Sequence, residues 1–278
     1  MNDLALLDAD EVARRLSVAD AADALEAALS GGLDPEADPP RGRLPVGSGE
    51  LLVMPSTTAA HATVKLVSIG GDPRIQGVCV VFDARTLAAV AVVDGVALTN
   101  LRTPAVSLVV ARRLASPEAR RLVVFGRGPQ ARIHAEAIAS IRPIEESTVF
   151  GRDAHPDEVD HAIAEADVIC CATTARDPLF DGSHVKDDAL VIAVGSHEPD
   201  AREVDDQLVN RAAVVVESRA SAMREAGDLI AAGLPAEQLV TLAELVAGAE
   251  IPADRPRLFK STGMSWEDAV VASALISR

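Results

Sequence analysis

Residues 122–131, which read L-V-V-F-G-R-G-P-Q-A, decide the fold. Four apolar residues typical of a buried strand run into the pattern G-x-G-x-x-A, and a helical pattern follows. In such a turn Gly126 permits the tight bend, Gly128 lets backbone approach a pyrophosphate, and Ala131 allows close packing of the helix. The stretch predicts a dinucleotide site, and a tight turn that binds nothing is the alternative. The cofactor contacts predicted from it are Gly126, Gly128, Pro129, Gln130 and Ala131.

Downstream of residue 112 apolar runs alternate with helical patterns. The runs predict buried parallel strands over 122–125, 147–150, 167–171, 189–194 and 213–217. The helical patterns cover 130–141 and 156–164. The sequence therefore predicts an α/β fold with a Rossmann-type doubly wound parallel sheet, assigned to residues 113–256.

Residues 1–112 show a different pattern, with short helices followed by short apolar runs. Residues 10–29 predict two short helices, with Ser17 and Asp20 as a capping signal, and short runs over 50–54, 62–68, 77–83 and 87–93 predict an antiparallel meander. Thr103 followed by Pro104 predicts the start of a helix. Residues 266–276 predict an amphipathic helix that returns to this module. The predicted first domain, of α+β type, is 1–112 completed by 257–278.

Composition excludes several classes of function. The formal charge of −16 and the 2% content of aromatic residues disfavour nucleic acid and anionic membranes as partners. The three cysteines form no disulfide framework, and no export signal or membrane span is visible, so a cytoplasmic protein is expected. The six histidines lack zinc-ligand spacing, and no metal is expected.

The end of the second predicted Rossmann strand reports on cofactor choice. An acidic residue there binds the ribose 2′-hydroxyl of NAD, whereas an arginine accommodates the 2′-phosphate of NADP. Gly151 offers no carboxylate and Arg152 follows it, which favours NADP(H) over NAD(H). Asp153 keeps NAD open, and a solvated loop charge is the alternative for Arg152.

Polar residues cluster in the first module, at Arg41, Lys65, Arg102 and Thr103. Arg102 precedes the predicted helix N-cap, where the helix dipole would help it to hold a carboxylate. A buried Lys65 could serve as general acid or base, but the residues alone favour a lysine on the wet face of its strand. His197, after a predicted strand end, could be a second proton-handling group or a satisfied loop residue.

Six blocks in order resemble the ornithine cyclodeaminase and mu-crystallin family. They are Met54-Pro55, 64–68, 98–105, 126–131, 225–229 and 259–264, and together they span nearly the whole chain. The resemblance implies a homodimer in which the first module and the C-terminal helix form the dimerisation and substrate domain, with a Rossmann domain between them.

The resemblance also assigns roles to residues. Lys65 matches the active-site lysine of the family, which reverses the expectation from the residues alone. Arg41, or less securely Arg43, and Arg102 match arginines that bind the substrate carboxylate. Arginines so placed would hold the α-carbon of the substrate against C4 of the nicotinamide, and Lys65 would exchange a proton with the substrate nitrogen. The residues implied to lie near the cofactor are Thr103, Thr173, Val194 and Gly195.

One departure bears on the reaction. Cyclodeaminases of this family carry an aspartate where this chain reads Gly195-Ser196-His197, and the reductase branch lacks it too. The sequence therefore predicts an NAD(P)H-dependent imine reductase or amino-acid dehydrogenase that acts on a small α-imino acid, such as a cyclic ketimine. The alternatives are ornithine cyclodeamination with His197 in place of the aspartate, and an NADP(H)-dependent binding protein without catalysis.

Overall fold

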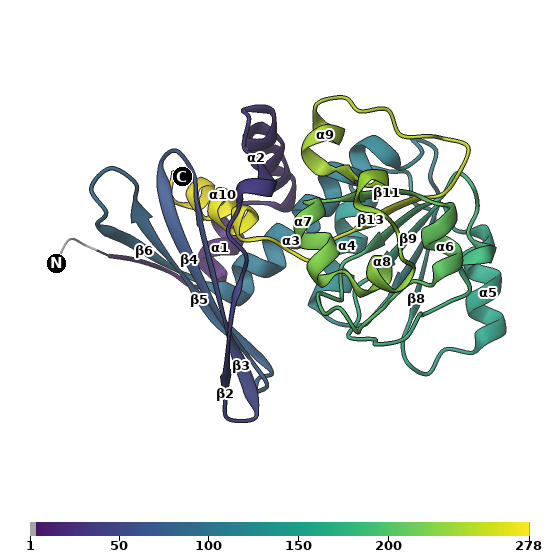
Figure 1. Cartoon of the computed structure of the whole chain (residues 1–278), viewed down its shortest axis with the longest axis horizontal. Coiled ribbons are helices and arrows are strands. Elements are labelled where there is room, and N and C mark those ends of the chain that lie inside the picture. The colour runs from purple at the N-terminus through teal and green to yellow at the C-terminus, as the bar shows by residue number, and fades with distance from the viewer. Residues whose placement is uncertain (1–3, 278) are drawn as a thin grey trace. The chain divides into compact units, whose positions relative to one another are not determined.

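The computed structural model describes residues 4–277, which form two compact units. The first comprises Met1–Val106 and Met264–Arg278, and the second comprises Ser107–Gly263. Figure 1 shows a sheet with its own helices in each unit. Among the described residues no helix combines the length and the apolar character needed to cross a membrane.

A six-stranded sheet in the order β1-β6-β5-β4-β3-β2 forms the first unit. Neighbouring strands are antiparallel except β1 and β6, which are parallel. The strands are β1 (Ala5–Leu7), β2 (Gly42–Val46), β3 (Gly49–Thr57), β4 (His61–Ile69), β5 (Ile75–Asp83) and β6 (Ala89–Asp94). The predicted meander is confirmed as β3 to β6, whereas the edge strands β1 and β2 were not predicted from the sequence.

Helices cover one face of this sheet. The helices α1 (Ala9–Arg15) and α2 (Val18–Ser30) confirm the predicted pair, and Ser17 and Asp20 form the expected capping box. The C-terminal helix α10 (Ser265–Ile276) packs on β3, β4 and β5 and against α2. Packed on both sides, α10 is buried at every residue from 265 to 272, so the predicted amphipathic pattern is wrong. A short 3₁₀ turn, η1 (Pro35–Ala37), precedes β2.

The long helix α3 (Gly95–Leu114) corrects another prediction. It begins eight residues before Thr103 because the Asp94 carboxylate caps it, accepting hydrogen bonds from the N–H groups of Val96 and Ala97 at 2.9 and 2.8 Å. Thr103 is therefore not the N-cap, and its hydroxyl donates to the Thr99 carbonyl one turn back. Arg102 lies in the helix interior, where the predicted support from the helix dipole does not apply.

The second unit holds a fully parallel seven-stranded sheet in the order β12-β11-β13-β10-β9-β7-β8. Its strands are β7 (Arg121–Phe125), β8 (Glu146–Phe150), β9 (Val168–Cys171), β10 (Leu190–Ala193), β11 (Ala213–Val216), β12 (Val240–Thr241) and β13 (Arg257–Lys260). This confirms the predicted α/β class. The sheet positions the ends of β7, β8, β9 and β10 along one edge, where ligands bind in such folds.

Short helices connect these strands. They are α4 (Pro129–Ala139), α5 (Pro156–Glu165), α6 (Asp206–Arg211), α7 (Arg219–Glu225), α8 (Gly227–Ala231) and α9 (Leu242–Val246), with 3₁₀ turns η2 (Gly182–His184) and η3 (Ala236–Gln238). The predicted helices near 130–141 and 156–164 correspond to α4 and α5. The apolar core of this unit includes Val123, Phe125, Ile169, Val191 and Leu258.

Strand β13 departs from the predicted domain limits, which placed 257–278 with the first domain. It inserts between β10 and β11, with Phe259 opposite Ile192 and Val215. The segment up to Gly263 therefore lies in the second unit, and the chain re-enters the first unit at Met264. The reason is a pairing between strands more than 40 residues apart in the chain, which no local pattern reveals.

Candidate active site

A cavity of about 620 Å³ opens at the glycine turn of the second unit. Of the predicted cofactor residues it is lined by Gly126, Gly128, Gly151, Arg152 and Thr173. Asp153, the residue that keeps NAD open, lines it as well. The sequence reasoning missed several further lining residues, namely Phe125, Arg127, Phe150, Ala172, Thr174, Ala175 and Leu179. The cavity thus joins the turn after β7, the end of β8 and the loop after β9.

Two glycines shape this cavity in different ways. Gly126 has φ +114°, and a Cβ there would lie 2.6 Å from the Ala172 carbonyl oxygen, so the turn requires glycine. Gly128 has an ordinary extended conformation, and a Cβ there would meet nothing within 4 Å. Gly128 is the N-cap of α4 without a side-chain cap, so open space lies beside helix N–H groups. This arrangement fits a pyrophosphate.

Two arginines, Arg127 and Arg152, line the cavity. The exposed Arg152 donates to the Thr174 hydroxyl at 3.3 Å, and Arg127 pairs with Asp153 at 2.9 Å. Hydrogen bonds and the Arg127 guanidinium lower the pKa of the Asp153 carboxyl. Arg127 occupies the middle position of G-x-G, a signal that the sequence reasoning did not use. A Cβ on Gly151 would lie 2.6 Å from Cζ of Arg127, so the missing side chain makes room for this guanidinium.

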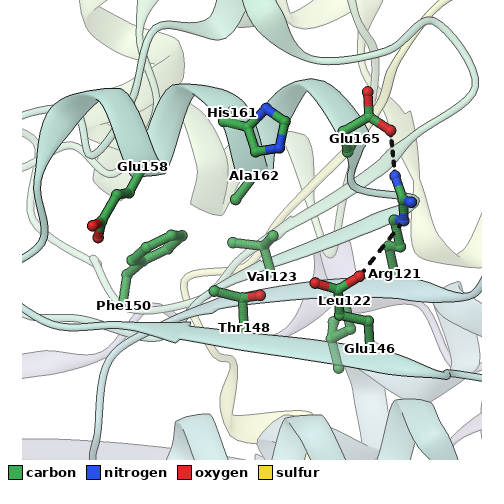
Figure 2. A pocket seen from close by; sticks show the side chains of 10 residues that line it. All are labelled: Arg121, Leu122, Val123, Glu146, Thr148, Phe150, Glu158, His161, Ala162 and Glu165. Carbon is green, nitrogen blue, oxygen red and sulfur yellow. Dashed lines mark hydrogen bonds and ion pairs between the residues drawn. The ribbon is translucent and has the colours of Figure 1, made fainter.

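A second cavity, of about 580 Å³, lies between β7, β8 and α5 (Figure 2). Its rim carries the carboxylates of Glu146, Glu158 and Glu165, and Arg121 is paired with both Glu146 and Glu165. Because the Arg121 charge is already neutralised by these glutamates, the rim is acidic overall and repels phosphates. Of these two cavities, the glycine-turn cavity is therefore the one that suits a dinucleotide.

The loops after β9 and β10 are held together by one buried carboxylate. Glu203 is fully buried and accepts hydrogen bonds from the N–H and hydroxyl of Thr173, at 2.9 and 2.8 Å, and from the N–H of Gly195 at 2.7 Å. Burial raises the pKa of Glu203, although Lys260 opposes this. Thr173 and Gly195 were predicted from the sequence, whereas Glu203, which fixes both, was not.

Lys260 anchors the same region from the end of β13. Its buried ammonium lies 2.9 Å from the Asp228 carboxylate and donates to the Ser196 carbonyl at 2.9 Å. Asp228 in turn accepts from the backbone N–H groups of Glu203 and Val204. Burial alone would raise the pKa of Asp228, but Lys260 and these hydrogen bonds outweigh it and the pKa is lowered.

In the first unit Lys65 points to the covered face of the sheet. It is 2% exposed, lies opposite Met54 and Cys79 on the neighbouring strands, and its ammonium is 2.7 Å from the Asp268 carboxylate. Burial lowers the pKa of Lys65, while Asp268 opposes the shift and Arg102 adds to it. The expectation of a solvent-facing lysine, drawn from the residues alone, is wrong.

Arg102 joins the same buried group. Its guanidinium lies 2.8 Å from Glu267 and 3.4 Å from Asp268, and both carboxylates come from α10. The sequence reasoning missed these two acids, although their adjacency at the start of an apolar helix was visible. Lys65 and Arg102, predicted to act together, are thus brought together within one unit.

The other predicted residues lie elsewhere in the two units. Arg41 is partly exposed just before β2, and Arg43 pairs with Glu50 across β2 and β3 at 3.1 Å. His197 is partly buried on the loop after β10. The predicted residues that do not line the glycine-turn cavity are Thr103, Pro129, Gln130, Ala131, Val194 and Gly195. Within residues 4–277, no group of three or more His, Cys, Asp or Glu residues is arranged to hold a metal.

The fold and the glycine-turn cavity define a protein of the Rossmann dinucleotide-binding class. A family model, "Ornithine cyclodeaminase/mu-crystallin family", matches residues 2–159 and 154–278. The chain belongs to this family, as the sequence blocks predicted.

Individual relatives agree with this assignment. The chain is 35% identical over 249 residues to the ketimine reductase mu-crystallin of Rattus norvegicus, covering 81% of this chain and 79% of the rat protein. The solved Delta(1)-pyrroline-2-carboxylate reductase of Thermococcus litoralis, in complex with NADH and L-proline, superposes with a TM-score of 0.89 at 26% identity, covering 99% and 97% of the two chains. A probable ornithine cyclodeaminase from Bordetella pertussis Tohama I gives 0.90 at 27% identity, covering 98% and 96%.

Proposed function

We propose that this protein is an NAD(P)H-dependent reductase of small cyclic α-imino acids, such as pyrroline-2-carboxylate, and that it also oxidises the matching amino acid. The observation that carries the proposal is the buried Lys65 ammonium beside Arg102, in a chain that also holds a glycine-turn cavity suited to a dinucleotide. The names of the rat and Thermococcus relatives support the same reaction.

The proposed chemistry divides between the two units. A dinucleotide whose pyrophosphate is held at the glycine turn would supply a hydride from its nicotinamide to the imine carbon. Arg102 and Arg41 bind the substrate carboxylate, and Lys65 donates a proton to the nitrogen as the C=N bond becomes a C–N bond. The products are the cyclic amino acid and oxidised cofactor. His197 is proposed as a second group that handles protons.

Turnover tests this proposal directly. Purified protein should oxidise NADPH or NADH in the presence of pyrroline-2-carboxylate or piperideine-2-carboxylate, and Lys65→Ala should abolish the reaction while nucleotide binding persists. A panel of imino and keto acids without turnover would contradict the proposal. Tight NADPH binding without turnover, unchanged in Lys65→Ala, would instead indicate a binding protein.

Ornithine cyclodeamination is the second candidate, favoured by the name of the Bordetella relative; it requires His197 to take the place of the aspartate that cyclodeaminases carry on this loop. The products distinguish the two reactions. A cyclodeaminase releases proline and ammonia from ornithine with no net change in the redox state of the cofactor, whereas a reductase consumes NAD(P)H in proportion to substrate.

For the cofactor we propose NADP(H) in preference to NAD(H). Arg152 and Arg127 both line the cavity at the end of β8, where the 2′-phosphate of NADP would lie. Asp153 competes for Arg127 through its ion pair. Arg152→Ala should lower kcat/KM for NADPH about tenfold or more with little change for NADH, since one charge-assisted contact contributes about 1.5–3 kcal/mol. Equal losses for both cofactors would contradict the preference.

We also propose a homodimer formed through the uncovered face of the six-stranded sheet. Side chains on this face are mostly apolar, with Ser68 and Gln76 among the polar exceptions. Several of the apolar ones are strongly exposed, with exposed fractions of 76% for Leu6, 55% for Leu44, 56% for Val46 and 40% for Val78. A largely apolar exposed face of this kind marks an interface with a protein partner. Light scattering should give twice the chain mass, and Val78→Glu should give a monomer; a wild-type monomer would contradict the proposal.

The proposed compartment is the cytoplasm. Cys79, Cys170 and Cys171 are buried and unbridged, which fits a reducing environment.

A further inference from the structure

The proposed catalytic lysine belongs to a buried group of four charges. Lys65 on β4 and Arg102 on α3 contribute the positive charges, and Glu267 and Asp268 on α10 contribute the negative ones. Glu267 contacts Arg102, and Asp268 contacts both cations, with Lys65 at 2.7 Å and Arg102 at 3.4 Å. The Thr99 hydroxyl accepts from the Lys65 ammonium at 3.3 Å.

Each group that faces Lys65 acts on its charge in a definite direction. Burial and the Arg102 guanidinium favour the neutral amine, and Asp268 favours the ammonium. Cys79, opposite Lys65 on β5, is a neutral thiol near neutral pH because burial raises its pKa to about 12. Asp268 is therefore the carboxylate on which the charge of Lys65 depends.

We propose that Asp268 is a positioning residue that acts through Lys65: it holds the ammonium charged and in place, so that a proton is available for the substrate nitrogen. The inference rests on the proposed reductase function. In that reaction one N–H bond of the Lys65 ammonium breaks as the new N–H bond of the product forms, which leaves Lys65 as the neutral amine. A lysine that is already neutral has no acidic proton to give at that step. Glu267 keeps Arg102 oriented, and the five N–H donors of a guanidinium allow it to bind a substrate carboxylate as well.

The charge of Lys65 can be read without turnover, because the chain has three lysines, Lys65, Lys186 and Lys260. Protein labelled with ¹³C at the lysine ε-carbon should give three resonances, assigned by replacing each lysine in turn with arginine. Asp268→Asn should lower the titration midpoint of the Lys65 resonance by about 1–3 pH units, the effect of a nearby opposite charge.

Asp167→Asn is the matched control. Asp167 pairs with Lys186 at 2.5 Å, is partly exposed and belongs to the second unit, whereas Lys65 belongs to the first. This change should move the Lys186 resonance and leave that of Lys65 in place.

Steady-state kinetics test the link to catalysis. With saturating NADPH, kcat/KM for the imino acid should fall above the pKa of Lys65, and Asp268→Asn should move this basic limb to lower pH by the same amount as the resonance. Well below that limb the Lys65 ammonium is charged in the variant as well, so kcat/KM should fall less there than above the limb, and the KM for NADPH should not change. A purely structural role would lower kcat/KM by the same factor at every pH.

Two results would overturn the inference. One is a folded Asp268→Asn variant with the wild-type Lys65 titration and basic limb. The other is a basic limb of the pH profile that moves while the titration midpoint of the Lys65 resonance does not. If Asp268→Asn yields no folded protein, Asp268→Glu is used instead. Its longer side chain changes the contact with Lys65, so the basic limb of the pH profile and the titration midpoint of the Lys65 resonance must move together. Movement of one without the other refutes the inference. If wild-type protein reduces no imino acid, the proposed function fails, while the resonances still report whether Asp268 holds Lys65 charged.

Discussion

The two glycines of the turn after β7 offer a sharp test of the nucleotide site. Gly126→Ala would force an alanine into φ +114° with its Cβ 2.6 Å from the Ala172 carbonyl oxygen. Gly128→Ala would place its Cβ in open space on a backbone with φ −85° and ψ 178°, which any residue adopts. The same chemical change thus meets opposite surroundings two residues apart.

The magnitudes follow from this geometry. A non-glycine residue in such a conformation costs about 1–3 kcal/mol, and displacing a backbone oxygen adds to it, so Gly126→Ala should lose at least about 2 kcal/mol of unfolding free energy. Gly128→Ala should change that free energy by less than about 1 kcal/mol, because alanine restricts the unfolded chain but is a poorer N-cap than glycine, and the two effects oppose each other. Its methyl group should nevertheless keep the pyrophosphate from the backbone and weaken NADPH binding about tenfold or more, about 1.4 kcal/mol.

Urea unfolding measures the first quantity, and titration followed by NADPH fluorescence measures the second. The expected outcome for Gly128→Ala is wild-type stability with lost affinity. If this variant binds NADPH as tightly as wild type, the open space beside Gly128 is not the phosphate site and the reasoning fails. If Gly126→Ala is as stable as wild type, the account of the turn fails instead.

Three further predictions test other parts of the molecule. Glu203→Gln should weaken NAD(P)H binding severalfold by calorimetry, because the amide cannot accept all the hydrogen bonds that hold Thr173 and Gly195; unchanged binding would show that these loops need no such link. Arg102→Lys should raise the KM for the imino acid more than it lowers kcat, since it removes a planar fork of donors, and an unchanged KM would argue against a role in substrate binding. Burial lowers the pKa of His134 from 6.5 to about 4, so as the pH falls His134 is protonated in the unfolded chain before it is protonated in the folded one. The free energy of unfolding should therefore fall by about 3 kcal/mol between about pH 6.5 and about pH 4. Urea unfolding of His134→Gln should lack this part of the pH dependence.

Local patterns predicted much of the fold because the interactions behind them are local. The capping box of Ser17 and Asp20 satisfies helix N–H groups within one turn, and the glycine turn needs no partner beyond its own strand and helix. The start of α3 at Asp94 is also a local feature, because the Asp94 side chain caps the first turn. Thr103 followed by Pro104 is a second N-cap pattern, from which the helix start was predicted instead. Tertiary packing of α3 is compatible with a proline in its interior.

Other features depend on pairings that span the chain. The position of β13 in the sheet is set by its hydrogen bonds to β10 and β11. The four residues of β13 do not reveal which strands they pair with. Glu203 also depends on the tertiary structure. Nothing in the sequence distinguishes it from the many surface acids, and only the fold buries it between two loops.

The amino-acid sequence by itself determined the class of the protein, because strand, glycine turn and helix follow one another within ten residues and the family blocks lie in order along the chain. The tertiary structure alone decided which face of β4 carries Lys65 and which acids neutralise it. The physical reason is that a buried charge is stable only beside an opposite one, and Asp268, the partner of Lys65, lies some 200 residues further along the chain.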